Sequence, residues 1–434
     1  MHKTKKNIRG ITLIALVISV IVLLILAGVT IAALSGDNGI LTRAKEAKEK
    51  TEQAQKNEEK TLSNMENVLE SYKFENVNVD DTNPAGAMPS DATILENDAN
   101  NGIVIKDRNN NEWVWIEVPK TTVFSGLTID TAKELTEQNY TDIKNKLIDY
   151  AIIYRDSSYS DEWYAKDGST LVTASTSNLT EAQKALVNGC GLTYDEYKIA
   201  YQKMLQSIYT YGGFWIGRYE AGIEGSVEDV SKARTSHTTV TIGSSLKAIS
   251  QKDAIPYNYV YCSEAQAIAK EMAPNNNYKS SLMFGIQWDL VCKFLEVKGG
   301  LITNDIKSDS TSWGNYNNAK IENITSGKYT IYNNSLLSEW TKISDSYTKQ
   351  SSGNNYRTLL STGISEYTKK MNIYDFAGNE WEWTLEKSSY TDYPCISKGG
   401  CYVGLGSDGP ASNHYYVGAS SSDSYIGFRS VFYK

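Results

Sequence analysis

The longest apolar stretch of the chain covers residues 11–34 and holds no charged side chain. A helix rises by about 1.5 Å per residue, so this stretch can cross a bilayer core of ~30 Å with room to tilt. Residues 1–10 are short and basic, a flank that stays cytoplasmic under the positive-inside rule. A cleaved secretory signal is the alternative, but its apolar core normally holds only about 7–15 residues. The pattern predicts one transmembrane helix at the cell membrane, with the N-terminus cytoplasmic and the C-terminal part extracellular.

A second helical pattern follows at residues 35–74. After a turn-forming start it contains no Gly or Pro between residues 41 and 74, and it is crowded with Lys, Glu and Gln. Apolar side chains recur on one helix face at Leu62, Met65, Leu69 and Tyr72. This predicts a stalk helix, which is either a coiled coil or a solvated spacer. Residues 75–101 are rich in Asn, Asp, Ala and Pro without periodicity, a composition typical of a flexible linker.

Residues 102–434 carry the patterns of a globular domain. Two short apolar runs, at residues 102–107 and 113–118, flank the polar turn 108–111 and predict a β-hairpin. Apolar spacings predict helices at residues 192–209, 252–273 and 282–297. Residues 299–371 are mostly Ser, Thr, Asn and Tyr, which predicts an unusually long irregular region.

The most informative pattern lies at residues 372–384. Residues 377–379 read Ala-Gly-Asn and predict a turn, because Gly and Asn tolerate positive φ. Residues 380–383 alternate Glu and Trp, which predicts a strand with both Trp on one face and both Glu on the other. The Glu face, joined by Asp375 and the turn carbonyls, could surround a hard cation, since Ca²⁺ binds carboxylate and backbone oxygens together. A half-buried strand with solvated Glu side chains is the alternative.

Charge and cysteine content narrow the function further. The formal net charge is −8 over 434 residues, which argues against nucleic acid as a partner. Five cysteines are scattered without a Cys-x-x-Cys motif, and the odd number leaves at least one thiol unpaired. Cys262 and Cys292 stand in apolar helical patterns and are expected to be small core residues, whereas Cys395 and Cys401 could pair across a short loop. Three isolated histidines argue against a zinc site.

The turn and strand at residues 377–383 resemble the Ala-Gly-Asn-x-Trp-Glu-Trp signature of the formylglycine-generating-enzyme type of C-type-lectin-like domain. Further motifs of that family follow in order: Phe214-Trp-Ile-Gly-Arg-Tyr-Glu-Ala221, Ser263-Glu-Ala-Gln-Ala-Ile-Ala269, Gln287-Trp-Asp289, Trp313-Gly-Asn315, Lys398-Gly-Gly-Cys-Tyr402 and Ile426-Gly-Phe-Arg429. The resemblance covers the chain from about residue 101 to the C-terminus, with residues 120–190 as an insertion. It implies an α+β fold with little regular secondary structure, its helices packed around a twisted antiparallel core.

The same resemblance implies a structural calcium ion. Carried over position by position, Asp375 and Glu382 would ligate through their side chains, and Gly378 and Glu380 through their backbone carbonyls. The ion would fix the loop that supports the adjacent face of the domain.

The resemblance also bears on whether the chain is an enzyme. The enzymes of the family carry a redox-active cysteine pair after the Arg/Lys-Gly-Gly-x-Tyr motif, and the two positions fall here on Gly404 and Gly409. Glycine supplies no thiolate, which is the nucleophile and metal ligand in that chemistry. Cys401 lies three residues before the first position. We therefore expect no enzyme, with a formylglycine-generating or related oxidase as the alternative.

Residues 401–425 are built of Tyr, Ser, Gly, Asn and Asp, the composition that recognition loops favour. An ordinary polar surface loop is the alternative. The segment lies between two family motifs, and this layout is similar to the variable region of proteins targeted by diversity-generating retroelements, where mutagenesis falls on adenines. The residues expected to form the exposed recognition set are Tyr402, Gly404, Leu405, Ser407, Asp408, Asn413, His414, Tyr416, Asp423 and Tyr425. Tyr415 is left out because its ring can pack inward. The ligand would be an extracellular protein or glycan that the sequence does not identify.

Residues 5–14 resemble a type IV prepilin leader. In that family a prepilin peptidase cuts after the glycine, here Gly10, and leaves Ile11 as the new N-terminus. The family usually carries Glu at the fifth mature position, where this chain has Ala15. That departure weakens the case for a regular filament and leaves membrane anchoring unaffected. The sequence thus predicts a membrane-anchored surface display protein, with a minor pilin or tip adhesin as a further alternative.

Overall fold

The computed structural model describes residues 16–26, 43–45, 47–58, 81–171, 180, 185, 188–243, 246–333 and 335–434. The chain divides into two compact units, residues 1–70 and 71–434. In the first unit, residues 16–26 and 47–58 are helical. Among the described residues, no helix combines the length and apolarity needed to span a bilayer. The predicted processing site at Gly10 and Ile11, and most of the predicted anchor and stalk, lie outside the described residues.

The second unit begins before residue 102, because residues 81–101 are ordered parts of it rather than the expected linker. Helix α3 (Pro84–Ala87) is capped by the Asn83 side chain and has Pro at its start, where the missing N–H costs nothing. Strand β1 (Thr93–Glu96) pairs with β2 (Val104–Lys106) in the antiparallel sense. The Trp215 indole donates to the Ala87 carbonyl over 3.1 Å, which ties this segment to the core.

The central sheet has six strands in the order β1-β2-β3-β5-β21-β8, all paired antiparallel. The added strands are β3 (Glu112–Glu117), β5 (Gly213–Gly217), β8 (Lys279–Leu282) and β21 (Ser430–Tyr433). The predicted hairpin is confirmed as β2 and β3, with Ile105 opposite Trp113. The C-terminal strand β21 lies between β5 and β8, so the first and the last strands of the domain belong to the same sheet.

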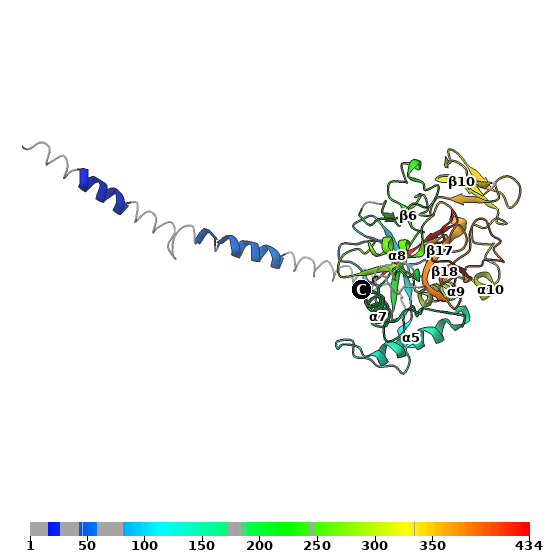
Figure 1. The fold of residues 1–434 in the computed structure, drawn as a ribbon, viewed down its shortest axis with the longest axis horizontal. Helices are drawn as coiled ribbons and strands as arrows, with labels where there is room; N and C mark the ends of the chain where they lie inside the picture. The colour runs from blue at the N-terminus through cyan, green and yellow to red at the C-terminus, as the bar shows by residue number, and fades with distance from the viewer. Residues whose placement is uncertain are drawn as a thin grey trace, which may run out of the picture. The chain divides into compact units, whose positions relative to one another are not determined.

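Three long helices accompany this sheet: α5 (Glu137–Ala151), α7 (Tyr194–Tyr211) and α9 (Gly285–Val297). Figure 1 shows α5 and α7 together at one side of the domain, with β10 at the far end. The predicted helices at 192–209 and 282–297 are confirmed within a few residues. The third is shorter than predicted, since α8 covers only Cys262–Lys270. The left-handed backbone at Asp253 and Tyr259 keeps the residues before it out of a helix.

A second sheet, with the path β19-β18-β17-β20, carries the C-terminal segments. Its long strand β17 (Trp381–Ser388) pairs antiparallel with β18 (Cys395–Lys398) and parallel with β20 (Ile426–Phe428). Strand β19 (His414–Val417) pairs with β18 and ends the path, and β4 (Tyr159–Ser160) pairs with the far end of β17. Residues from the insertion at 120–190 therefore extend the sheet that bears the recognition segment.

The stretch 299–371 is less irregular than predicted. Strands β9 (Ile321–Ile324), β10 (Lys328–Asn333), β13 (Tyr347–Lys349) and β14 (Thr358–Leu360) form two small sheets with β11 (Leu336–Leu337) and β12 (Thr341–Lys342). A separate small core stabilises them, made of Ile321, Ile324, Ile343, Leu360 and Ile364. Alternating polar residues hid these short strands from the sequence pattern.

The remaining elements are short. They are α4 (Lys120–Val123), η1 (Ile152–Tyr154), β6 (Gly222–Ile223), η2 (Val230–Lys232), β7 (Ala248–Ile249), α10 (Thr303–Lys307), η3 (Glu366–Thr368), β15 (Lys369–Lys370) and β16 (Ile373–Tyr374). The described part of the chain is thus a mixed α+β protein, as predicted.

Candidate ligand-binding face

The predicted recognition segment, residues 401–425, forms two turn-rich loops on either side of strand β19. The framework around it is buried and firmly paired. Tyr402 donates its N–H to the Asn379 carbonyl over 2.9 Å, and Trp381 donates to the Tyr425 carbonyl over 2.8 Å. Both bonds run to the turn and strand at residues 377–383, which therefore hold the two ends of the segment together.

The structure separates the predicted recognition residues into three groups. The exposed ones are Leu405, Ser407, Asp408 and Tyr416. The partly exposed ones are Gly404, Asn413, His414, Asp423 and Tyr425. Tyr402, predicted to be exposed, is fully buried, and its hydroxyl lies 3.2 Å from Ser424 Oγ. Tyr415, which we expected to pack inward, is 43% exposed.

Four exposed tyrosines gather beside the edge strand, and we call them the tyrosine patch: Tyr390, Tyr393, Tyr415 and Tyr416. The Tyr416 ring lies 4.9 Å from that of Tyr390 and 5.8 Å from that of Tyr393. The Tyr415 ring stacks on buried Trp381 at 5.2 Å. Large aromatic rings with polar tips make strong contacts at low entropy cost. The patch thus has the chemistry of a recognition surface.

Of the four patch tyrosines, sequence reasoning predicted only Tyr416, because Tyr415 was expected to pack inward and the other two were not considered. Tyr390 and Tyr393 stand in the β17–β18 connection, outside the predicted segment. Their sequence surroundings, Ser-Ser-Tyr-Thr-Asp-Tyr, have the same Tyr/Ser/Asp composition as residues 401–425. That similarity is the signal that could have found them.

A buried ion network lies under His414. Lys398 Nζ is 3.0 Å from Asp289 and 3.4 Å from Glu386, and Arg155 lies 3.0 Å from Asp289. His414 Nε2 lies 2.9 Å from Lys398 Nζ and 3.2 Å from Glu386. Although burial would raise the pKa of Glu386, Lys398, His414 and Arg155 lower it to about 2. The imidazole of His414 is therefore held by internal partners, and its ring stacks at 4.5 Å on that of Tyr159.

The first loop of the segment rests on a second loop, residues 310–319. Asn317 donates its N–H to the Gly404 carbonyl over 2.9 Å and its side-chain amide to the Val403 carbonyl over 2.7 Å. The Asn318 side chain accepts the Gly406 N–H over 3.2 Å. These bonds fix the backbone below the exposed side chains of the loop.

The predicted turn is confirmed by positive φ at Gly378 and Asn379. The carboxylates expected to hold calcium already have partners. Asp375 accepts from Thr368 Oγ1 and the Gly363 N–H, both over 2.7 Å. Glu382 is paired in a buried bidentate contact with Arg429, whose Nη2 lies 2.7 Å away. These side chains fit a cation poorly, although calcium binding itself stays an untested prediction.

Among the described residues, no group of three or more His, Cys, Asp or Glu side chains is arranged to hold a metal. The neighbouring Glu380 side chain is 1% exposed, and its oxygens make no hydrogen bond of good geometry, although the Asn258 side chain lies close enough to lower the pKa of Glu380. Glu220 lies beside it and accepts the Glu380 N–H over 3.0 Å. Burial and the surrounding carboxylates raise the pKa of both Glu220 and Glu380 well above the ordinary value. This part of the site therefore favours protonated carboxyl groups.

The thiols of the described chain are all free and buried. Cys262 and Cys292 are core residues, as predicted. Cys395 and Cys401 are not joined. Burial raises the pKa of the Cys401 thiol to about 12, which makes it a poor nucleophile at neutral pH. Gly404 lies at the partly exposed surface and Gly409 is buried against Trp381.

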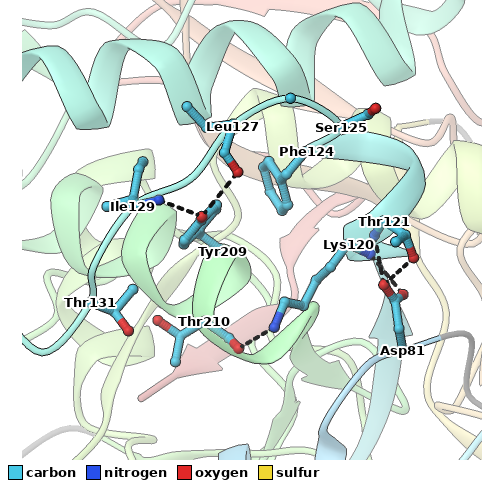
Figure 2. Close-up of a pocket in the computed structure, with 11 residues that line it drawn as sticks. Asp81, Lys120, Thr121, Phe124, Ser125, Leu127, Ile129, Thr131, Tyr209 and Thr210 are labelled. Atoms are coloured by element: carbon cyan, nitrogen blue, oxygen red, sulfur yellow. Dashed lines mark hydrogen bonds between the residues drawn. The ribbon is translucent and has the colours of Figure 1, made fainter.

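A cavity of about 540 Å³ lies elsewhere, between α4 and the C-terminal end of α7. Figure 2 shows Asp81 accepting hydrogen bonds from Lys120 and Thr121, and Lys120 donating to the Thr210 carbonyl. The Tyr209 hydroxyl accepts the Ile129 N–H over 2.9 Å on the opposite side. These polar groups form hydrogen bonds with one another, so their role here is to join the segments that line the cavity.

No family model matches the chain, and no curated protein matches it. Among solved structures, Treponema denticola variable protein 1 shares 12% sequence identity with it. The match covers 51% of this chain and 85% of that protein, with a TM-score of 0.28. Similarity at this level assigns no family.

The different burial of two tyrosines in the segment gives a direct prediction. We expect Tyr402→Ala to lower the free energy of unfolding by about 3 kcal/mol, because a fully buried ring is lost and leaves a cavity. Tyr416→Ala should change it by less than about 1 kcal/mol, since its ring is exposed. Urea denaturation followed by tryptophan fluorescence measures both, because all nine Trp lie beyond residue 112. Equal losses in the two variants would contradict the burial seen here.

Proposed function

We propose that this protein is a membrane-anchored surface protein whose C-terminal domain, of C-type-lectin-like type, binds an external ligand. The observation that carries the proposal is the tyrosine patch, four exposed aromatic side chains on and beside the edge strand β19. Contiguous aromatic groups of this kind are unusual on a surface without a binding role. They lie over a rigid support, because the buried ion network and the paired loops leave little freedom below them.

The division between support and surface favours a diversified binder. The framework side chains Lys398 and Arg429 are fully buried and ion-paired, whereas Tyr416, Leu405, Ser407 and Asp408 face solvent. Exposed positions can change without loss of packing, and the buried ones cannot. A face built in this way tolerates sequence variation at its contact positions. We include Tyr415 in the proposed contact set and omit Tyr402.

An oxidase of the formylglycine-generating type is the weaker proposal. The two family cysteine positions are Gly404 and Gly409 in this chain, and the nearby Cys401 thiol is buried with a raised pKa. A reactive thiol needs an exposed site with a lowered pKa. These features argue for binding without catalysis.

The anchor rests on the sequence alone, through the uncharged residues 11–34 and their basic flank. We propose that this segment holds the protein at the cell membrane with the domain outside. Pilus assembly, calcium binding and prepilin-peptidase processing are further proposals that rest on the sequence resemblances.

Binding is tested by comparing two double variants of the full chain displayed on cells. Tyr415→Ser with Tyr416→Ser removes half of the patch, whereas the control Tyr140→Ser with Tyr150→Ser changes partly buried rings on α5, a helix outside the patch. Arrays of glycans and of cell-surface proteins serve as probes. We expect the patch variant to lose at least tenfold in affinity for any ligand that wild type captures, and the control to keep it. Ligands retained by the patch variant would place the binding face elsewhere.

A further inference from the structure

Lys349 is a buried lysine at the end of strand β13. Its side chain is fully enclosed, and its Nζ donates to the backbone carbonyls of Tyr316, Ala319 at 2.7 Å and Gln350 at 3.4 Å. No Asp or Glu of the described residues forms an ion pair with it. The hydrogen-bond partners of its Nζ are therefore three neutral carbonyl oxygens.

Among the described residues, two other buried lysines, Lys328 and Lys398, differ in this respect. Lys328 Nζ lies 2.9 Å from the Asp253 carboxylate, and Lys398 Nζ lies 3.0 Å from that of Asp289. Removing an ammonium from water costs several kcal/mol, which a buried carboxylate usually offsets. At Lys349 the converging carbonyl dipoles take that role, as they do around bound cations.

The number of acceptors indicates the charged form. An ammonium has three N–H donors, which matches the three carbonyls, whereas a neutral amine has two. Burial lowers the pKa of Lys349 to about 7, which means that desolvation disfavours the ammonium. Three directed carbonyl dipoles oppose that cost.

We propose that the carbonyls of Tyr316, Ala319 and Gln350 form a cation site that the Lys349 ammonium fills from within the chain. The chemical class that fits is a monovalent cation able to donate N–H bonds, that is, a small primary ammonium. Shortening the side chain opens the site to such an ion from solution. The proposal is independent of whether the tyrosine patch binds a ligand.

The cation site is linked to the recognition segment, because the loop at residues 316–319 that Lys349 contacts also supports that segment. Tyr316 donates its hydroxyl to the Gly399 carbonyl over 2.8 Å, and Asn317 donates to the Gly404 carbonyl over 2.9 Å. The Asn317 nitrogen is bonded directly to the Tyr316 carbonyl carbon, and the Tyr316 hydroxyl is the tip of the same residue's side chain. Lys349 is thus a positioning residue, and it acts on the segment through residues 316–319.

The test is chemical rescue of the full chain in detergent. Lys349→Ala removes the atoms of one propylammonium ion, so propylammonium chloride is the probe. We expect this variant to have a lower urea midpoint than wild type, and the probe to restore at least half of the loss. Tetramethylammonium chloride at equal ionic strength has no N–H donor and should restore none.

Two further variants keep the result decisive. Leu360→Ala opens a nearby apolar cavity without a carbonyl set, and propylammonium should not rescue it. Lys349→Met keeps the stem and removes the charge, so it should lower the midpoint and speed hydrogen exchange in residues 316–319. If Lys349→Ala does not fold, Lys349→Met gives the reading alone. Wild-type behaviour of Lys349→Met, or equal rescue of Leu360→Ala, would overturn the proposal.

Discussion

Arg429→Met is expected to lower the free energy of unfolding by about 3–5 kcal/mol, because it leaves a buried charge without a partner. Arg429 is fully buried and donates to both oxygens of Glu382, with the shortest contact at 2.7 Å. Its remaining donors go to the Gly217 carbonyl over 2.9 Å and the Tyr374 carbonyl over 2.8 Å. One side chain therefore connects the sheet of β17 to the central sheet and to strand β16.

The loss should be large because the surroundings are acidic. The Arg429 guanidinium lies among four buried carboxyl side chains, those of Glu220, Asp375, Glu380 and Glu382. Without it, Glu382 keeps its burial and loses its counter-charge, so it can only stay buried in the protonated form. The variant should consequently recover part of its stability as the pH falls.

Urea denaturation at pH 7, read by tryptophan fluorescence, measures the change. Lys369→Met is the control, because it breaks the exposed pair with Glu366 and should cost no more than about 1 kcal/mol. A loss for Arg429→Met as small as that of the control would show that the buried pair contributes little. The site would then have to gain its rigidity from packing alone.

The parts of the fold that the sequence predicts best are those set by local patterns. The β2–β3 hairpin follows from two apolar runs around a polar turn, and α9 from a long apolar helix pattern. The alternation at residues 380–383 correctly places Trp381 and Trp383 on one face. Local sequence could not predict that the Glu face is buried and ion-paired. Strand β20 pairs with β17, and this brings Arg429 into contact with Glu382. The partner of Glu382 is thus a charged residue that lies 47 positions away in the sequence.

The candidate site divides in the same way. Composition identifies residues 401–425 as a recognition segment but cannot tell Tyr402 from Tyr415. Tyr402 follows the buried strand β18 and enters the core, whereas Tyr415 lies on the edge strand β19. Strand β19 pairs with β18 alone and ends its sheet, so the rings of both Tyr415 and Tyr416 stay exposed. The environment of Lys349 could not be predicted from the sequence, because its partners are backbone carbonyls, which every residue carries.

Glu380→Gln is expected to raise the free energy of unfolding by about 1–3 kcal/mol at pH 8, an unusual gain for a buried polar position. Both Glu380 oxygens lack a hydrogen bond of good geometry, the nearby Asn258 side chain lowers the pKa of Glu380 only against the larger effect of burial, and the side chain is 1% exposed beside Glu220. Burial and the neighbouring carboxylates raise the folded-state pKa well above the value of the unfolded chain. Glutamine keeps the shape and removes the ionisable group, and its amide can donate to the unpartnered Asn258 oxygen.

The sign of the pH dependence follows from that raised pKa. The folded state keeps the Glu380 proton above about pH 4.3, where the unfolded chain releases it. Stability from this group is therefore complete below that pH and is lost as the pH rises toward the folded-state pKa, by up to about 1.4 kcal/mol per pH unit. The gain from Glu380→Gln should accordingly be small at pH 4 and grow toward pH 8.

Urea midpoints of wild type and variant, taken at several pH values between 4 and 8, measure this growth. Glu366→Gln is the matched control. Burial raises the pKa of the partly exposed Glu366 carboxyl, but the contacts with Lys369 and Tyr374 outweigh burial and lower it below the ordinary value. Its removal should cost a little stability, and the cost should increase with pH rather than reverse. If Glu380→Gln destabilises the chain at pH 8, the Glu380 carboxylate has a favourable partner there. The Asn258 side chain, which lowers the pKa of Glu380, would be the first candidate, and Asn258→Ala should then destabilise wild type at pH 8.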